Sequence, residues 1–122
     1  CTLAGNAELL RQAVCNLVEN AVKYSPVGSV VHIAGHRDGE WFQIVVADQG
    51  PGIPESLRQR IFEPFFRVDD SRSRQLGGAG LGLALVRAIA EFHGGAVYVE
   101  KSRGAGSRFV LKLPCEQDPP PD

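Results

Sequence analysis

Apolar residues recur at helical spacing near the start of the chain. They follow one another three or four positions apart, as on one face of an α-helix, and they are Leu10, Ala13, Val14, Leu17 and Ala21. Asn6 precedes this pattern and is a favoured N-cap residue, whereas Ser25-Pro26-Val27-Gly28 is a typical helix terminator. We therefore predict an amphipathic helix from Asn6 to Tyr24.

Two β-hairpins are predicted from apolar runs on either side of turn residues. The first pairs residues 29–36 with 41–47 across Arg37-Asp38-Gly39-Glu40, which contains the Asp-Gly dipeptide common in hairpin turns. The second pairs residues 96–101 with 107–113 across a Gly-Ala-Gly turn. Because Trp41 to Ala47 is apolar on both faces, we expect a central strand covered by helices on at least one side.

Two further helices complete the predicted architecture. A short one is expected over Glu55 to Phe62, and an apolar one follows a glycine-rich stretch and stops at Gly94-Gly95. The order α-β-β-α-α-β-β predicts an α+β fold, a two-layer α/β sandwich with three helices on one face of the sheet. We expect the sheet to be mixed, mostly antiparallel and of about five strands, with Thr2-Leu3-Ala4 as a short strand end.

Composition limits the kind of protein. A length of 122 residues suits one domain, which we place at 1–114, followed by a proline-rich tail at 115–122 that we expect to be disordered. The net charge of −1 and the lack of a long apolar run favour neither nucleic acid nor direct membrane contact. Three cysteines without metal-ligand spacing indicate reduced thiols in the cytosol. Since the chain contains no methionine, we expect a fragment of a longer protein.

The glycine-rich stretch Gly77-Gly78-Ala79-Gly80-Leu81-Gly82-Leu83 runs directly into the last predicted helix. Its backbone can approach a ligand closely, and the helix N-terminus offers N–H donors to phosphate oxygens. It is neither a P-loop nor a dinucleotide fingerprint, because it lacks Gly-Lys-Ser/Thr and no strand runs into it. Glycine-rich turns before helices are common, so this stretch alone leaves phosphate binding open.

Polar residues gather on a second face of the first helix. Gln12, Asn16, Asn20 and Lys23 fall within about 80° of one another. Asparagine is a poor helix former, which indicates that these residues serve something other than helix stability. A basic cluster also extends from the second predicted helix towards the glycine-rich stretch, and it fits either a solvated loop face or a phosphate-facing lid. Its residues are Arg58, Arg60, Arg67, Arg72 and Arg74.

Four segments, in this order, resemble the sequence boxes of bacterial two-component sensor histidine kinases. Residues 16–24 resemble the N box, 48–53 the G1 box, 62–66 the F box and 78–83 the G2 box. The likeness extends from Gly5 to Pro114. It implies the Bergerat-type ATP-binding fold of the gyrase, heat-shock chaperone and histidine kinase ATPase superfamily, with ATP and Mg²⁺ as ligands.

The resemblance also implies roles for individual residues. Asn20 matches the magnesium ligand with Asn16 beside it, and Lys23 matches a lysine that contacts phosphate. Tyr24 matches an aromatic residue near the adenine, and Asp48 the acceptor of a hydrogen bond from the adenine amine. The other implied ATP contacts are Gly50, Gly52, Ile53, Phe65, Arg67, Gly78, Gly80, Leu81, Gly82 and Leu83. Where this family most often has threonine the chain has Ala79, which we expect to weaken phosphate ordering.

By this resemblance, the chain is the catalytic domain that donates the γ-phosphoryl group of Mg·ATP to a histidine. That histidine would lie on a separate dimerisation domain of the same protein, and a response regulator would be the next partner. The domain would be cytoplasmic, within a parent protein of the bacterial inner membrane. Apart from Asn16 and Lys23, which position ATP, we expect no catalytic residue here, and we predict that His32, His36 and His93 are surface or structural residues.

Three alternatives remain open. One is an ATP hydrolase of the same superfamily, which would use a glutamate where this chain has Asn16. Another is an anti-sigma serine kinase, against which the Phe-Glu-Pro-Phe-Phe segment argues. The third is a non-catalytic module that senses nucleotides.

Overall fold

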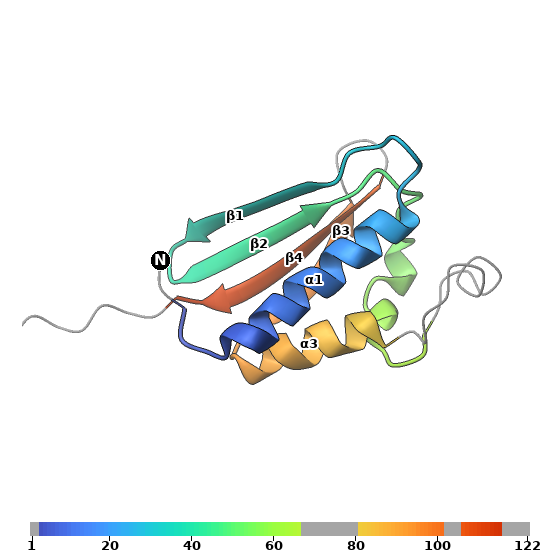
Figure 1. Ribbon diagram of the computed structural model, residues 1–122. Helices are drawn as coiled ribbons and strands as arrows, with labels where there is room; N and C mark the ends of the chain where they lie inside the picture. Colours follow the sequence, from blue (N-terminus) through green and yellow to red (C-terminus); the bar gives the residue numbers. More distant parts are fainter. Residues whose placement is uncertain (1–2, 67–80, 102–105, 116–122) are drawn as a thin grey trace, which may run out of the picture.

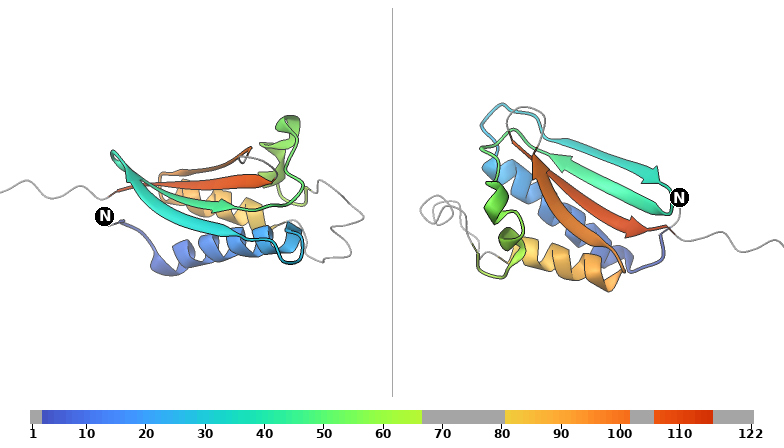
Figure 2. Two further views of the ribbon diagram at one scale, coloured as in Figure 1. Left: turned by 90° about the horizontal axis from the view of Figure 1, so that it is seen from above. Right: turned by 180° about the vertical axis from the view of Figure 1, so that it is seen from behind.

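Two layers make up the part of the chain that the computed structural model describes, which comprises residues 3–66, 81–101 and 106–115. A four-stranded sheet forms one layer, and helices α1 (Ala7–Tyr24) and α3 (Gly82–Phe92) lie against one face of it. Figures 1 and 2 show both helices on the same side of the curved sheet. The predicted α+β sandwich is thereby confirmed in its layers.

Helix α1 begins and ends where its sequence predicts. Asn6 has extended backbone angles, and its side-chain oxygen accepts a hydrogen bond from the Leu9 N–H at 3.1 Å, which satisfies one free donor of the first turn. The buried side chains of the helix are Ala13, Leu17 and Ala21, members of the predicted apolar face. Local capping and helical periodicity therefore fix both the ends of the helix and its orientation.

The strands are β1 (His32–Asp38), β2 (Trp41–Ala47), β3 (Ala96–Lys101) and β4 (Ser107–Pro114). Their order is β1-β2-β4-β3, and all three pairings are antiparallel. The prediction of a mixed sheet of about five strands was wrong for the described residues. The second hairpin returns from α3 so that β4 pairs antiparallel with β2, and Leu3 and Ala4 are not in a strand.

Two local predictions also need correction. Strand β1 starts later than expected and continues to Asp38, which pairs with Trp41 across the two-residue loop Gly39-Glu40. Such short loops match the natural twist of antiparallel strands. The helix predicted from Glu55 to Phe62 is split into two 3₁₀ turns, η1 (Glu55–Leu57) and η2 (Arg60–Phe62).

The core lies between the sheet and the two helices. Phe109, Leu111 and Leu113 alternate along β4 and are almost fully buried, and Phe62 packs edge-on against Phe109 with ring centroids 6.2 Å apart. Helix α3 adds the buried residues Val86, Ile89 and Ala90. None of the helices in the described residues is long and apolar enough to cross a membrane.

This packing brings three chain segments to one end of the molecule. The C-terminal end of α1, the end of β2 and the N-terminal end of α3 all lie at the right of Figure 1. At the opposite end, Cys115 is buried and its N–H donates to the Glu40 carbonyl at 2.7 Å. The predicted tail beyond it, 116–122, lies outside the described residues.

Candidate functional site

Asp48 is the most firmly held acidic side chain at this end of the molecule. It follows β2 directly and is only 5% exposed. Its Oδ1 accepts two backbone hydrogen bonds, from the Gly50 N–H at 2.9 Å and from the Ser107 N–H at 3.2 Å. Its own N–H donates to the Ser107 carbonyl at 2.9 Å. Two donors on one oxygen hold Oδ1 in place at the end of β2.

Backbone segments approach Asp48 so closely that glycine is required around it. A Cβ on Gly106 would lie 1.9 Å from the Asp48 carbonyl oxygen, and Gly106 has a φ of 108°. A Cβ on Gly50 would lie 2.7 Å from the Tyr24 carbonyl oxygen at the end of α1. The family resemblance connects Gly50 only with a ligand, but the absence of a side chain is already required by this contact within the chain.

Sequence reasoning missed Ser107 altogether. It lies 59 residues from Asp48, and only the pairing of β2 with β4 brings the two together. Its residue type gave no signal, because the contact uses its backbone. Knowledge of the strand order would have been needed to find it.

The polar face of α1 points to the same end of the structure. Asn16 is partly buried, and its Nδ2 donates a long hydrogen bond, 3.4 Å, to the carbonyl of Gly82 in the first turn of α3. Asn20, one turn further along, is also partly buried. The Lys23 ammonium lies 5.5 Å from the centre of the Tyr24 ring. Asn16 thus connects the predicted N box to the end of the predicted G2 box.

The start of α3 borders a shallow apolar hollow. Leu81 and Gly82 are exposed, whereas Leu83 packs against the core. Leu81, Gly82, Ala84 and Leu85 line the hollow, whose volume is about 450 Å³. This hollow therefore lies beside α3 and is separate from the Asp48 carboxylate.

The three phenylalanines of the predicted F box differ in environment. Phe62 belongs to the core, and Phe66 is partly buried with the Arg60 guanidinium 4.8 Å from its ring centre. Phe65 is 69% exposed and has a positive φ of 67°, an uncommon backbone conformation for a bulky residue. Its role as an ATP contact stays a prediction.

Several predicted contacts lie outside the described residues, namely Arg67, Gly78 and Gly80, together with the lid candidates Arg72 and Arg74.

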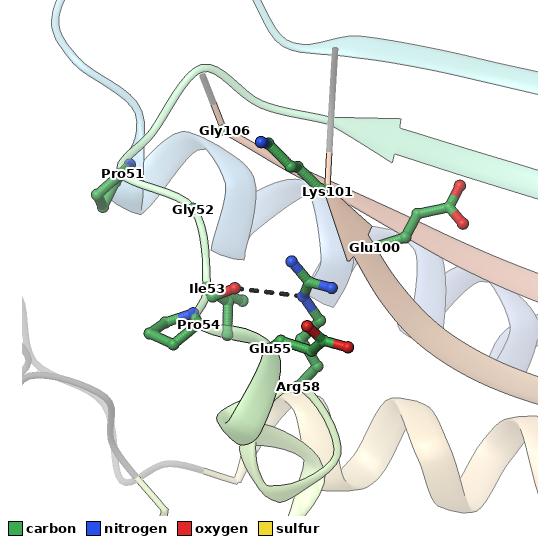
Figure 3. A pocket seen from close by; sticks show the side chains of 9 residues that line it. All are labelled: Pro51, Gly52, Ile53, Pro54, Glu55, Arg58, Glu100, Lys101 and Gly106. Atoms are coloured by element: carbon green, nitrogen blue, oxygen red, sulfur yellow. Dashed lines mark hydrogen bonds between the residues drawn. The ribbon is translucent and has the colours of Figure 1, made fainter. Parts of the chain in front are cut away.

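The loop that follows Asp48 lies within the described residues. Gly52 there has a φ of 79°, and the Ile53 carbonyl accepts a hydrogen bond from Arg58 Nε at 3.3 Å (Figure 3). Within residues 3–66, 81–101 and 106–115, no three His, Cys, Asp or Glu side chains cluster in a way that could hold a metal ion.

His93 has a structural role, as predicted for this residue. Its Nε2 accepts from the Asn6 N–H at 2.9 Å, and its Nδ1 lies 2.8 Å from the Ile89 carbonyl oxygen, so the neutral ring carries its proton on Nδ1. The imidazole therefore connects the start of α1 to the end of α3. His32 and His36 are exposed on the edge strand β1.

The pKa values of Glu8 and Arg11 are shifted, at the end of α1 that lies away from Asp48. The pKa of Glu8 is lowered by a hydrogen bond from Arg11 and by the positive charge of Arg11, and the pKa of Arg11 is raised by the same pair. Both side chains are exposed to solvent. This pair belongs to the first turns of the helix and not to the site.

Residues 5–117 match a family model described as histidine kinase-, DNA gyrase B- and HSP90-like ATPase. Among curated proteins, the chain is 45% identical over 115 residues to the sensor-like histidine kinase SenX3 of Mycolicibacterium smegmatis, which covers 94% of this chain and 30% of SenX3. The chain thus spans less than a third of the length of such relatives.

Solved structures agree with this match. The mycobacterial sensor histidine kinase MprB is similar with a TM-score of 0.81 and 36% identity, covering 92% of this chain and 74% of that one. A structure of full-length ShkA in complex with AMPPNP is similar with a TM-score of 0.70 and 38% identity, covering 87% of this chain and 21% of that one.

Proposed function

The chain belongs to the family of histidine kinase-, DNA gyrase B- and HSP90-like ATPases, as the catalytic ATP-binding domain of a sensor histidine kinase, and on this premise we propose that it binds Mg·ATP with the adenine on Asp48. The observation that carries the proposal is the buried Asp48 carboxylate, whose Oδ1 is held by two backbone N–H groups. We assign the other oxygen, Oδ2, to the adenine amine. ATP would be preferred over GTP, because guanine presents a carbonyl oxygen in place of that amine and cannot donate a hydrogen bond at this position.

Asn16, Asn20 and Lys23 would hold the phosphates and the metal. Mg²⁺ prefers oxygen ligands and is usually held by few protein groups together with substrate phosphates and water. The Asn20 amide oxygen fits this requirement, and its neutrality suits a triphosphate that already supplies negative charge. Because Asn16 Nδ2 donates to Gly82, its Oδ1 is the atom that would contribute to the metal site. Bound Mg²⁺ would neutralise phosphate charge.

The remaining contacts would come from the loop after Asp48 and from the start of α3. We assign Tyr24, Gly50, Gly52 and Ile53 to the adenine side, and Leu81, Gly82 and Leu83 to the phosphate side. Support for the second assignment is the position of the α3 N-terminus beside Asn16, where free backbone N–H groups favour anions. Arg67, Gly78, Gly80 and Phe65 belong to the same proposal.

The whole protein would be a histidine kinase. In this reaction the γ-phosphoryl group leaves ATP as its bond to the β-phosphate oxygen breaks, and a neutral imidazole nitrogen of a histidine forms the new bond. Catalysis of this kind depends mainly on positioning and charge neutralisation. The histidine would lie on a separate dimerisation domain, and a response regulator would accept the phosphoryl group next. By analogy with sensor kinases, this domain would be cytoplasmic and its parent would lie in the inner membrane.

Asn16 argues against the hydrolase alternative. Activation of water requires a side chain that accepts a proton, and an amide cannot do so. The Nδ2 of Asn16 is moreover engaged with the Gly82 carbonyl. We therefore expect the chain alone to turn over ATP very slowly, and Asn16→Glu to be the substitution that would provide a base.

Calorimetric titration tests the proposal. We expect ATP to bind, GTP to bind at least about tenfold more weakly, and Asp48→Asn to lose ATP binding, because the amide would present an N–H to the adenine amine. Asn20→Asp should change the Mg²⁺ dependence of binding. Lys112→Gln, on the far face of the sheet where the lysine lies 4.5 Å from the Trp41 ring centre, is the control. Equal affinity of wild type and Asp48→Asn for ATP would refute the assignment.

A further inference from the structure

A second pocket lies next to the loop that follows Asp48. It has a volume of about 400 Å³ and is lined by residues 51–55, Arg58, the last two residues of β3 and Gly106. This volume lies within the range of roughly 300–1,000 Å³ that is usual for ligand pockets. None of its described lining residues comes from α1, so it is separate from Asn16, Asn20 and Lys23. We call it the loop pocket.

Two cationic side chains enter the loop pocket from different elements. Arg58, which follows η1, is partly buried and donates from Nε to the Ile53 carbonyl at 3.3 Å. That hydrogen bond uses the Nε–H of the guanidinium and fixes the orientation of the group, and it does not use the two terminal nitrogens. Lys101 comes from the end of β3 and also lines the pocket, and Figure 3 shows the Arg58 guanidinium beside Ile53 and the Lys101 side chain near Gly106.

The described lining of the pocket contains two cationic and two acidic side chains, but one of the acidic side chains is paired outside it. Glu100 is turned away from the two cations (Figure 3) and forms an ion pair with Arg108 on the open face of the sheet. Within the described part of the chain, no ion pair joins Glu55, Arg58 or Lys101 to another residue. Among the described residues, two positive groups and one carboxylate therefore face the space, which leaves a net charge of about +1 from these groups for a ligand to neutralise.

We propose that the loop pocket binds a small oxyanion, a phosphoryl or carboxylate group, between the Arg58 guanidinium and the Lys101 ammonium. Arginine suits this role because its planar guanidinium can donate N–H hydrogen bonds to two oxygens at once. Glu55 repels excess negative charge, so the site favours an anion with a single charge. The site is additional to the proposed nucleotide site and shares only the Gly52 and Ile53 segment with it.

The test is an NMR titration of the ¹⁵N-labelled chain with sodium phosphate and, separately, with sodium acetate at constant ionic strength. We expect the amide signals of Gly52, Ile53, Lys101 and Gly106 to shift and to saturate with at least one anion. A response to phosphate alone supports a phosphoryl ligand, and a response to acetate alone supports a carboxylate ligand. A response to both anions supports a site that accepts either group. No saturable shift with either anion would overturn the proposal.

Variants locate the anion. Arg58→Gln and Lys101→Gln should each weaken binding by about tenfold, the loss expected for one charge-assisted hydrogen bond. Glu55→Gln should tighten binding, because it removes a like charge. Lys112→Gln is the control for a general loss of positive charge, and the dispersion of each spectrum reports whether the variant is folded.

A response that survives both Arg58→Gln and Lys101→Gln would overturn the proposal. So would a response abolished by Lys23→Gln, since phosphate would then occupy the nucleotide site. Calorimetry with ATP on the same variants keeps the two proposals separate: ATP binding should persist in Lys101→Gln. The Asp48→Asn variant, which should no longer bind ATP, should still show the NMR response to the anion.

Discussion

Asp48 is expected to contribute to folding as well as to ligand binding, and two substitutions separate these contributions. In Asp48→Ala, the buried N–H groups of Gly50 and Ser107 both lose their acceptor. An unsatisfied buried donor costs about 1–3 kcal/mol, so the two together should cost about 2–6 kcal/mol. Against the roughly 5–15 kcal/mol that holds a typical domain folded, this is a large share.

Asp48→Asn keeps an oxygen at Oδ1. Both N–H groups retain an acceptor, but the hydrogen bonds lose the strengthening effect of the negative charge. We expect a cost of about 1–2 kcal/mol, smaller than that of the alanine variant, because neutral hydrogen bonds contribute less than charged ones and the amide is easier to bury. The asparagine variant should thus be folded and yet defective in ATP binding.

Urea unfolding followed by circular dichroism measures both variants. With a slope of about 2 kcal/mol per molar urea, within the usual range for small proteins, the alanine variant should shift its midpoint down by about 1–3 M. Asp38→Ala is the control, because Asp38 is an exposed aspartate of β1 and its loss should change stability by no more than about 0.5 kcal/mol. An unchanged midpoint for Asp48→Ala, or equal losses for the two Asp48 variants, would refute the reasoning.

Further predictions concern the two helices. Leu17→Ala removes a fully buried side chain of α1 and should destabilise the fold by about 2–5 kcal/mol, as seen in urea unfolding. Gly5→Ala would place a Cβ 2.2 Å from Cδ2 of His93, so the ring must move and the Asn6–His93 bond should break, at a cost of at least about 1 kcal/mol; a variant as stable as wild type would contradict the close packing. Because the Glu8 pKa is lowered in the folded state, the Glu8–Arg11 pair stabilises the fold above the ordinary pKa of 4.5 and loses this effect as the pH falls through the lowered value. Arg11→Gln should return the Glu8 pKa towards 4.5 in an NMR titration, and an unchanged pKa would exclude Arg11 as the cause.

Local sequence signals were sufficient for some elements. The periodic apolar face and the Asn6 cap predicted both ends of α1, and the apolar run from Trp41 predicted β2. Both elements could be predicted because they depend on residues close together in the chain. The helix expected after Pro54 was less predictable. A segment of eight residues is too short for helix propensity to decide, and tertiary packing of Ile61 and Phe62 leaves it as two 3₁₀ turns.

Contacts between distant segments were beyond local reasoning. The resemblance selected Asp48 as a ligand group, but its attachment to Ser107 depends on strand order. Similarly, the resemblance implied that Phe65 contacts ATP, but its positive φ of 67° and its 69% exposure could not be predicted from the local sequence. The loop pocket corresponds to no sequence motif, since Arg58 and Lys101 are distant in the sequence and line the same pocket only in the folded chain.

The placement of β4 has a consequence for how the chain folds during synthesis. This strand pairs with both β2 and β3, and it supplies Phe109, Leu111 and Leu113 to the core, although it is the last element of the described chain. The ribosome must add 67 more residues, Asp48 to Pro114, after β2 is complete. At about 5–20 residues per second this takes roughly 3–13 s.

During that interval the apolar face of α1 and the inner face of the β1–β2 hairpin exist without the strand that covers them. Exposed apolar surface of this kind is a substrate for chaperones and a risk for aggregation. Truncation anywhere before Leu113 should therefore be far more damaging than the small number of lost residues would indicate. Because β4 closes the core, the fold can be completed only after this strand has been synthesised.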